Sequence, residues 1–403
     1  MPEMGPWRVS MYQHTGFMMR ELVENVERYT PGGYHPVDIG DTITDRQDDY
    51  TVVQKLGHGV FSTVWLVKRQ RKQLDSAEQP QVSFHALKIL RADLGDARAS
   101  HELDFLQRLG QVGRSSHPNI VMLEDSFTVS GPNGQHRCLV FPLLAFSLHS
   151  DKSWSLTPSQ RHHTCQQLAS AVAFLHSHNV CHGDLTPSNI AFKVPSIQSM
   201  TESRLLELLG PIKEETLRLR KGSVVASASF SGLDTSSLAT VQIIDFGCAF
   251  SGNSPPPTSR CPVEFFQPEL LFGSLIYYTF TSQYMFQVGF QIFTHLVAFV
   301  VRHHGPVPAH WKGKFVWSEY GLAQPGQPVA PSPEPDWWWS DDVKRPTPSL
   351  EDRFAKRASY LSAAQRDELP RLLRDMVAWE PSRRISAAEA DRRLKALVFF
   401  SLG

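Results

Sequence analysis

Residues 181–192 carry polar side chains whose types and spacing suit phosphate and metal chemistry. The segment reads Cys-His-Gly-Asp-Leu-Thr-Pro-Ser-Asn-Ile-Ala-Phe and includes His182, Asp184 and Asn189. A carboxylate such as that of Asp184 can accept the hydrogen bond of a substrate hydroxyl. The amide oxygen of Asn189 is a hard ligand of the kind that Mg²⁺ prefers. The same residues also fit a solvated polar loop, so the function of the segment depends on the rest of the chain.

A glycine-rich turn closer to the N-terminus is a second candidate for phosphate binding. Strand-like runs over 50–56 and 61–67 enclose it, and it contains Gly57 and Gly59. Glycines in such a turn let the backbone approach a ligand and point amide N–H groups at phosphate. Hairpin turns also use glycine for conformational reasons alone, so this turn is a weak signal by itself.

Lys88 strengthens the prediction of a phosphate site. It lies in a third strand-like run, 84–90, among apolar neighbours that disfavour a solvated lysine. The next segment, 94–109, has the apolar spacing of a helix. Glu102 falls on the inward side of that helix and Asp104 on the other side. We therefore expect Glu102 to pair with Lys88 and Asp104 to be a surface charge.

A third candidate is Asp245, which follows an apolar strand-like run that begins at Val241. A buried strand that delivers an aspartate into a turn can present a second oxygen ligand to Mg²⁺. Strands over 119–129 and 137–144 complete a predicted five-stranded first lobe, and Thr157-Pro158 predicts the start of a helix over about 157–178. Further helices are predicted over 202–209, 285–301, 362–378 and 386–397, and the Ser-rich stretch 193–240 is interpreted as an insertion.

Composition limits the partners and the compartment. Lys plus Arg and Asp plus Glu each total 40 of the 403 residues, so charge gives no indication of direct binding to nucleic acid or to an anionic membrane. The five cysteines contain no Cys-x-x-Cys pair, which favours reduced thiols in an intracellular compartment. The N-terminus lacks the pattern of a signal peptide, and the longest apolar run, 286–301, is too short to span a bilayer and carries polar residues.

Two other features have a structural interpretation. The pairs His162-His163 and His303-His304 do not complete a zinc site, because adjacent side chains on a helix point apart and no Cys/His set accompanies them. The run 337–339 consists of tryptophans and fits either an exposed partner site or a long loop packed on its own lobe. Packing is the favoured interpretation.

The motifs together resemble those of the eukaryotic protein kinases, over about residues 45–400. They occur in the family's order as Gly57 and Gly59, Lys88, His182-Gly-Asp184 with Asn189, Asp245-Phe-Gly247, and Gln267-Pro-Glu269. A narrower resemblance, to the SR-protein-specific kinases and their fungal members, rests on the stretches 32–41, 56–66, 182–189 and 194–211.

The resemblance implies an α+β, bilobal kinase fold with a small β-rich N-lobe and a larger helical C-lobe. We expect an N-terminal extension over 1–44, the N-lobe over 45–144, and the C-lobe over 145–403 with an insertion at about 193–240. Lys88, Asp184 and Asp245 would converge in the cleft between the lobes.

The resemblance also implies a role for each matching residue. Catalysis is assigned to Asp184, Lys88, Asn189 and Asp245, with Mg²⁺ held by Asn189 and Asp245. ATP binding is assigned to Leu56, Gly57, Gly59, Ser62, Val64, Ala86, Lys88, Glu102, Phe141, Pro142 and Leu144. Structural roles are a stack of Leu106, Leu123, His182 and Phe246 between the lobes, and an ion pair of Glu269 with Arg384.

Three departures from the family pattern bear on activity. Gly183 replaces the usual arginine, so phosphorylation of 250–265 is not expected to act as a switch. Thr186 replaces the usual lysine and removes a cation from the transferred phosphate. Aligning Val288-Gly289 with the family places Tyr284 where a buried aspartate belongs, and no Asp or Glu lies between Glu269 and Glu319. The stretch 274–285 is also unusual, either as divergent sequence or as translated intron.

Two functions remain open. The first is an ATP- and Mg²⁺-dependent serine/threonine kinase acting on serine of Arg/Ser-rich proteins, in the cytoplasm, the nucleus or both. The second is a nucleotide-binding or scaffolding pseudokinase with little transfer activity, which Thr186 and Tyr284 favour. The metal and phosphate ligands named above are present in the sequence, which favours the first.

Overall fold

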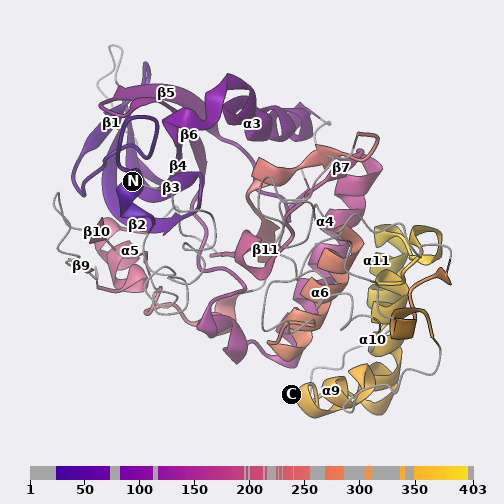
Figure 1. Ribbon diagram of the computed structural model, residues 1–403. Coiled ribbons are helices and arrows are strands. Elements are labelled where there is room, and N and C mark those ends of the chain that lie inside the picture. Colours follow the sequence, from indigo (N-terminus) through magenta and orange to yellow (C-terminus); the bar gives the residue numbers. More distant parts are fainter. Residues whose placement is uncertain are drawn as a thin grey trace, which may run out of the picture. The chain divides into compact units, whose positions relative to one another are not determined.

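The computed structural model describes residues 24–72, 82–111, 117–194, 197, 200–211, 214–215, 224–225, 227–228, 230–238, 240–254, 268–285, 301, 305–309, 336–340 and 349–397. The chain divides into two compact units (Figure 1). The first unit comprises Met1–Ser116, Val121–Phe146 and Lys193–Ser237, and the second comprises His117–Ile120, Ser147–Phe192 and Leu238–Gly403.

The first unit is built on an antiparallel sheet whose strands follow the order β1-β2-β3-β4-β6-β5. The strands are β1 (Thr42–Thr44), β2 (Asp48–His58), β3 (Ser62–Arg71), β4 (Val82–Leu90), β5 (Asp125–Gly131) and β6 (Gly134–Pro142). The prediction of five strands was wrong by one. The additional strand, β1, has only three residues, and Ile43 is its single buried side chain, so it has almost no alternation to detect.

The predicted strand over 119–129 was also wrong in its start. β5 begins at Asp125, whereas Ile120 belongs to the second unit and forms an isolated parallel bridge with Ile243. An apolar run alone does not show that the chain passes from one packed unit to another within it.

The hydrophobic core of the first unit covers one face of the sheet. Its members are Ile43, Tyr50, Val52, Trp65, Val67, Leu87, Ile89, Cys138 and Val140. They recur at every second position within each strand, as the period of a β-strand requires. Register shifts in β2 after Val52 and Lys55 interrupt the alternation, so that Gln54 and Lys55 are both buried. Lys55 is neutralised there by a buried ion pair with Glu24.

One long helix, α3 (Gly95–Gln111), follows β4 and confirms the helix predicted over 94–109. It buries Glu102 and Leu106 and exposes Asp104, as the sequence pattern predicted. The insertion adds α5 (Glu202–Leu209), which matches the predicted helix, and a short ladder of β9 (Glu214–Glu215) with β10 (Val224–Val225).

The described residues of the insertion group with the first unit up to Ser237. The Nζ of Lys68 on β3 lies 3.0 Å from Oε2 of Glu202 on α5. The amide of Ala228 donates to the carbonyl of Lys55 on β2, at 2.9 Å. The insertion therefore extends the sheet-bearing unit.

The second unit is mostly helical. Its helices are α4 (Pro158–Ser177), α6 (Pro268–Thr281), α9 (Leu350–Arg357), α10 (Ala363–Met376) and α11 (Ala387–Ala396), and α4 packs against both α6 and α11. Two small ladders pair β7 (Val180–Cys181) with β12 (Phe250–Ser251) and β8 (Ile190–Lys193) with β11 (Thr240–Ile243). Short 3₁₀ turns in the two units lie at Val26–Arg28, Ala92–Leu94, Asp151–Ser155, Pro187–Asn189, Thr235–Ser237, Phe246–Cys248, Asp336–Trp339 and Pro381–Arg383.

The sequence signals identified some of these helices and missed others. Thr157 caps α4 in a capping box with Gln160, and proline follows at the first position, as predicted. The helix predicted over 285–301 lies almost entirely outside the described residues. α6 and α9 were missed: α6 buries every residue from Phe272 to Thr281 and so has no amphipathic period, and α9 is short. None of the described helices is long and apolar enough to cross a bilayer.

A buried guanidinium connects the start of α4 to its neighbours. Arg161 is only 7% exposed, and none of its hydrogen bonds to the described residues involves a carboxylate. Its five N–H donors reach the carbonyls of Ser153, Trp154, Leu156 and Thr279 and the hydroxyl of Ser282. Full use of the donor set is what makes this buried charge tolerable.

Two histidines pack together where the N-terminal stretch meets the sheet. The rings of His35 and His136 are 4.7 Å apart. His136 Nδ1 donates to the carbonyl of Leu90 at 2.9 Å. Burial, together with the neighbouring His136, lowers the pKa of His35 to about 4, and burial also lowers the pKa of His136. Both rings are therefore neutral in the folded protein at pH 7.

This pair predicts a loss of stability in mild acid. The folded pKa values lie below the unfolded value of about 6.5. The stability of the fold with both buried rings neutral is therefore fully present above that pH and is lost as pH falls toward 4. Each histidine can change the free energy of unfolding by at most about 1.4 kcal/mol per pH unit. Urea titrations from pH 7 to pH 4.5 should show a shallower loss for His35→Gln than for wild type. His163→Gln, which alters an exposed histidine on α4, should leave the slope unchanged; an unchanged slope in His35→Gln as well would contradict the prediction.

Candidate active site

The sheet places the predicted nucleotide-binding residues of the first unit on one face. Val64 is paired across the strands with both Gly57 and Lys88, and Ala86 is paired with Phe141. Paired side chains project on the same side of a sheet, as do residues two positions apart in a strand. Val64, Ala86, Lys88 and Phe141 therefore share a face, and it is the face opposite the hydrophobic core.

The remaining candidates border that face. Ser62 begins β3 two positions before Val64 and shares its face. Leu56 is half-buried near the end of β2. Pro142 ends β6, and Leu144 is half-buried in the connection that follows.

The glycines of the β2–β3 turn have open space around them. A Cβ placed on Gly57 would meet no atom within 4 Å, and one on Gly59 would reach only Ser62 Oγ, at 3.8 Å. Neither glycine has a positive φ. Neither packing nor a positive φ therefore requires glycine at these two positions, and the space beside the turn is open.

Lys88 on β4 and Glu102 on α3 form a buried ion pair. Lys88 Nζ lies 2.9 Å from Oε1 and 2.7 Å from Oε2 of Glu102. The two residues are 8% and 4% exposed. The predicted pairing is confirmed, and it holds the ammonium group on the face that carries Ala86 and Val64.

In the second unit, Asn189 holds the carboxylate of Asp184. Asn189 Nδ2 donates to Asp184 Oδ2 at 2.9 Å and to the Asp184 carbonyl at 2.8 Å. Because both bonds use the amide nitrogen, the amide oxygen of Asn189 is directed away from Asp184. The backbone carbonyl of Asn189 accepts the N–H of Ile244 at 2.9 Å, which fixes this loop beside β11.

His182 fixes the start of the same loop, and its hydrogen bonds define its tautomer. Nε2 lies 3.0 Å from the carbonyl of Ile244, which can only accept, so Nε2 carries the proton. Nδ1 accepts the backbone N–H of Asp184 at 3.3 Å. The ring also packs edge-on against the buried Phe246 at 4.9 Å. His182 is therefore a positioning group for Asp184, and it is not a base.

Asp245 follows β11 in an uncommon backbone conformation. Its φ of 63° and ψ of 78° lie in the left-handed region, and its Oδ1 accepts the N–H of Gly247 at 3.2 Å. A non-glycine residue held there is strained, and such strain is concentrated at functional sites. The exposed carboxylate of Asp245 and the amide oxygen of Asn189 are hard oxygen donors, so the two residues fit Mg²⁺.

Comparison with known proteins gives the family. Residues 50–393 match the protein kinase domain. The chain belongs to the protein kinase family. A solved kinase domain aligns with a TM-score of 0.55 at 16% identity, covering 89% of this chain and 97% of that one, which confirms the predicted fold.

The relatives are distant. The serine/threonine-protein kinase spk-1 of Caenorhabditis elegans is 32% identical over 219 residues, which are 52% of this kinase chain and 20% of that protein. The serine/threonine-protein kinase SRPK of Physarum polycephalum is 34% identical over 175 residues, covering 41% of this chain and 38% of that protein. The predicted resemblance to SR-protein kinases is confirmed at this distance. The chain spans less than half the length of either relative.

The loop of this kinase requires glycine at position 183, where kinases usually have arginine. Gly183 has a φ of +76°, and a Cβ there would lie 2.1 Å from the carbonyl oxygen of Cys248. An arginine would therefore demand a different path for one of the two backbone segments. The departure seen in the sequence is built into the backbone of the loop.

The remaining structural predictions differ in how far the described residues test them. The side chain of Glu269 is among the undescribed ones, so its ion pair with Arg384 stays a prediction; Arg384 Nε donates to the carbonyl of Ala378 at 2.6 Å. Of the predicted stack, the contact of His182 with Phe246 is present, and the part that includes Leu106 and Leu123 stays a prediction. The tryptophan run 337–339 lies in a short 3₁₀ turn, and Trp338 is 1% exposed, as packing predicted.

Tyr284, which the alignment places at the position of the missing aspartate, lies just beyond the end of α6. Its hydroxyl is 3.2 Å from Nδ1 of His149, and its ring lies 5.2 Å from that of Tyr278. The segment 286–300, on which that alignment depends, is outside the described residues. The unusual stretch 274–285 thus forms the end of a buried helix and the turn after it.

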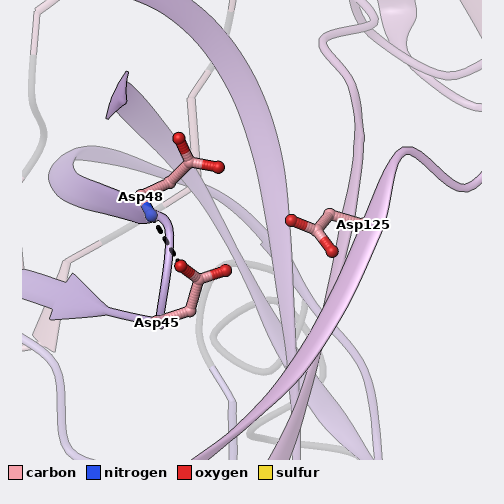
Figure 2. A group of neighbouring side chains, drawn as sticks. All are labelled: Asp45, Asp48 and Asp125. Atoms are coloured by element: carbon pink, nitrogen blue, oxygen red, sulfur yellow. Dashed lines mark hydrogen bonds between the residues drawn. The ribbon is translucent and has the colours of Figure 1, made fainter. Parts of the chain in front are cut away.

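An acidic cluster elsewhere in the first unit has the composition of a metal site. Asp45, Asp48 and Asp125 offer carboxylate oxygens that all lie within 4.8 Å of one another (Figure 2). The guanidinium of Arg69 already supplies a cation, with Nη2 2.5 Å from Asp48 Oδ2 and 3.5 Å from Asp125 Oδ2. Figure 2 shows that Asp45 Oδ1 is bonded to the backbone N–H of Asp48, which is the bond of a turn. We interpret the cluster as structural.

The geometry at position 183 predicts a large effect of a single methyl group. Gly183→Ala must pay both for the positive φ and for the contact with Cys248, so it should lower the free energy of unfolding by more than about 2 kcal/mol. Gly305→Ala is the matched control, because Gly305 also has a positive φ, of +98°, but a Cβ added there would meet no atom within 4 Å. It should lose only about 1 kcal/mol. Equal losses in urea titrations of the two variants would show that the contact with Cys248 does not matter.

Proposed function

We propose that the chain is an ATP- and Mg²⁺-dependent serine/threonine kinase that phosphorylates serine in Arg/Ser-rich proteins. The observation that carries this proposal is the hydrogen bond from Asn189 to the carboxylate of Asp184. This bond orients the Asp184 carboxylate, which would accept the substrate hydroxyl. It also leaves the amide oxygen of Asn189 for Mg²⁺. Membership of the protein kinase family supports the reaction class, and the distant relative named SRPK supports the substrate class.

In the proposed reaction the serine oxygen of the substrate attacks the γ-phosphorus, and the bond to the ADP oxygen breaks. Asp184 accepts the hydrogen bond of the attacking hydroxyl and takes up its proton as the new bond forms. Asn189 keeps the carboxylate oriented, and His182 holds the backbone of Asp184. Asn189 and Asp245 would hold Mg²⁺, which neutralises charge on the phosphates when it is bound.

The first unit would bind the nucleotide. Lys88, held by Glu102, would pair with phosphate oxygens, and the open turn at Gly57 and Gly59 would cover phosphates. Ala86 and Phe141 present an apolar surface suited to adenine on the same face of the sheet, next to the connection that contains Leu144.

A nucleotide-binding pseudokinase is the second candidate. Thr186, which is 8% exposed and precedes the 3₁₀ turn at Pro187–Asn189, has an uncharged side chain, so this position supplies no cation to the transferred phosphate. The loss of that cation would lower turnover and leave nucleotide binding in place.

The first prediction of this proposal concerns catalysis. Asp184→Ala should lower kcat on an Arg/Ser-rich peptide by about 10²–10⁴-fold, because it removes the group that accepts the hydroxyl proton. The dissociation constant for Mg·ATP should change little. Asp367→Ala, which removes an exposed aspartate on α10, should keep wild-type turnover. Phosphorylation that survives in Asp184→Ala would refute the assigned role, and a wild-type chain that binds Mg·ATP without transfer would favour the pseudokinase.

A second prediction concerns the nucleotide. Mg·ATP should raise the melting temperature, because a ligand that binds only the folded state stabilises it, by about 2.7 kcal/mol at a hundred times its dissociation constant. Lys88→Met should reduce the shift with and without Mg²⁺, whereas Asp245→Asn should reduce only the Mg²⁺-dependent part. Lys68→Met, on β3, is the control and should behave as wild type. No shift in the wild-type chain would refute both candidate functions.

A further inference from the structure

The tip of the glycine-rich turn is not held by burial of its own side chains. Val60 is 68% exposed and Phe61 is 37% exposed. The amide of Gly59 donates to the carbonyl of Ser62 at 2.8 Å, which closes the turn. An exposed turn with open space around its glycines loses conformational entropy when it orders on a ligand, unless something else fixes its backbone.

That support comes from the segment 24–41, which we name the N-terminal strap. Its Tyr34 is 2% exposed, and the Tyr34 hydroxyl lies 2.8 Å from the carbonyl oxygen of Gly59 and 3.2 Å from that of Val60. A hydroxyl has one proton to donate, and both oxygens are acceptors, so the Tyr34 O–H is shared between two successive peptide groups of the turn.

Arg91, at the end of β4, contacts the same part of the turn. Its Nη1 donates to the carbonyl of Val60 at 3.0 Å, and its backbone N–H donates to that of Phe61 at 2.9 Å. Its guanidinium also lies over the rings of Tyr34 and Phe61, 5.8 and 6.0 Å from their centroids. Three successive carbonyls of the turn are therefore fixed by Tyr34 and Arg91.

The strap itself is firmly attached to the sheet. The amides of Ala92 and Asp93 donate to the carbonyls of Gly33 and Gly32, at 3.1 and 2.6 Å. Asn133 Nδ2 donates to the Tyr34 carbonyl at 2.7 Å. At the other end of the strap, Glu24 forms its buried ion pair with Lys55. Tyr34 is therefore held from its own backbone and can act as a fixed donor.

Fixing a carbonyl also fixes the amide joined to it. In a trans peptide group, the C=O of one residue and the N–H of the next point in opposite directions. With the carbonyls of Gly59 and Val60 turned toward Tyr34, the N–H groups of Val60 and Phe61 point away from it. Successive amides aimed in one direction form the concave donor set that binds phosphate oxygens.

We propose that Tyr34 is a positioning residue for nucleotide phosphates, which it orients by holding the carbonyls of the glycine-rich turn from the N-terminal strap. This inference rests on the proposed nucleotide binding. It assigns a role to a segment for which the sequence showed only a family-like stretch at 32–41 within an extension, and it makes the strap part of the phosphate site. A turn that is fixed before binding loses less entropy when ATP arrives. Because the turn would contact only the phosphates, the effect is expected for ligands that carry them.

The test compares two ligands that differ in their phosphates. Calorimetric titrations of the full chain with Mg·ATP and with adenosine are made for wild type, Tyr34→Phe and Tyr50→Phe. Tyr34→Phe should weaken Mg·ATP about three- to tenfold, the worth of one hydrogen bond, and leave adenosine within about twofold. Tyr50→Phe removes a hydroxyl of β2 that donates to Asp125, and it should leave the affinity for both ligands unchanged.

Each other outcome overturns a defined statement. Unchanged Mg·ATP binding in Tyr34→Phe, or an equal loss for both ligands, would show that Tyr34 supports the fold in general and does not position phosphates. A wild-type chain that binds neither ligand would overturn the proposed function itself. The wild-type titration thus separates failure of the proposed function from failure of the inference.

Discussion

The alternation of side chains across the antiparallel sheet is the constraint on which the first unit depends. One face is occupied by a core that includes Trp65, Leu87 and Val140. The opposite face is thereby reserved for Lys88 and its neighbours at every second position. A shift of one residue in the pairing of β4 would exchange the two faces, burying a lysine in the core. The apolar core thus determines where the ammonium group lies.

The ion pair of Lys88 with Glu102 adds a second condition to that arrangement. Removal of either partner from a buried pair leaves an uncompensated charge, which is typically more destabilising than the pair is stabilising. The pair therefore constrains α3 to present Glu102 to β4, whatever its net contribution to stability. The pair holds the amino group of Lys88 on a face with half-buried apolar neighbours, Val64 and Ala86.

Local sequence patterns predicted much of this, and their failures have physical causes. Spacing on a helix was sufficient to choose Glu102 over Asp104, and caps identified α4 because capping is a short-range interaction. β1 and α6 were missed because a three-residue strand and a fully buried helix have no period to detect. Arg91 was missed because its partners in the turn are backbone carbonyls, which every residue has, so no residue type signals them. The strap motif around Tyr34 was noticed, but its contact with Gly59 spans 25 residues and depends on the fold.

The backbone explains one departure from the kinase pattern, the glycine at position 183. The positive φ of Gly183 and the nearby carbonyl of Cys248 leave no room for a side chain at that position. The loop 182–189 is held by bonds made within its own unit, from Asn189 to Asp184 and between His182 and Ile244. These bonds need no phosphate group to form them. The orientation of Asp184 is therefore set by bonds within the folded chain, at a loop whose backbone has room only for glycine at position 183.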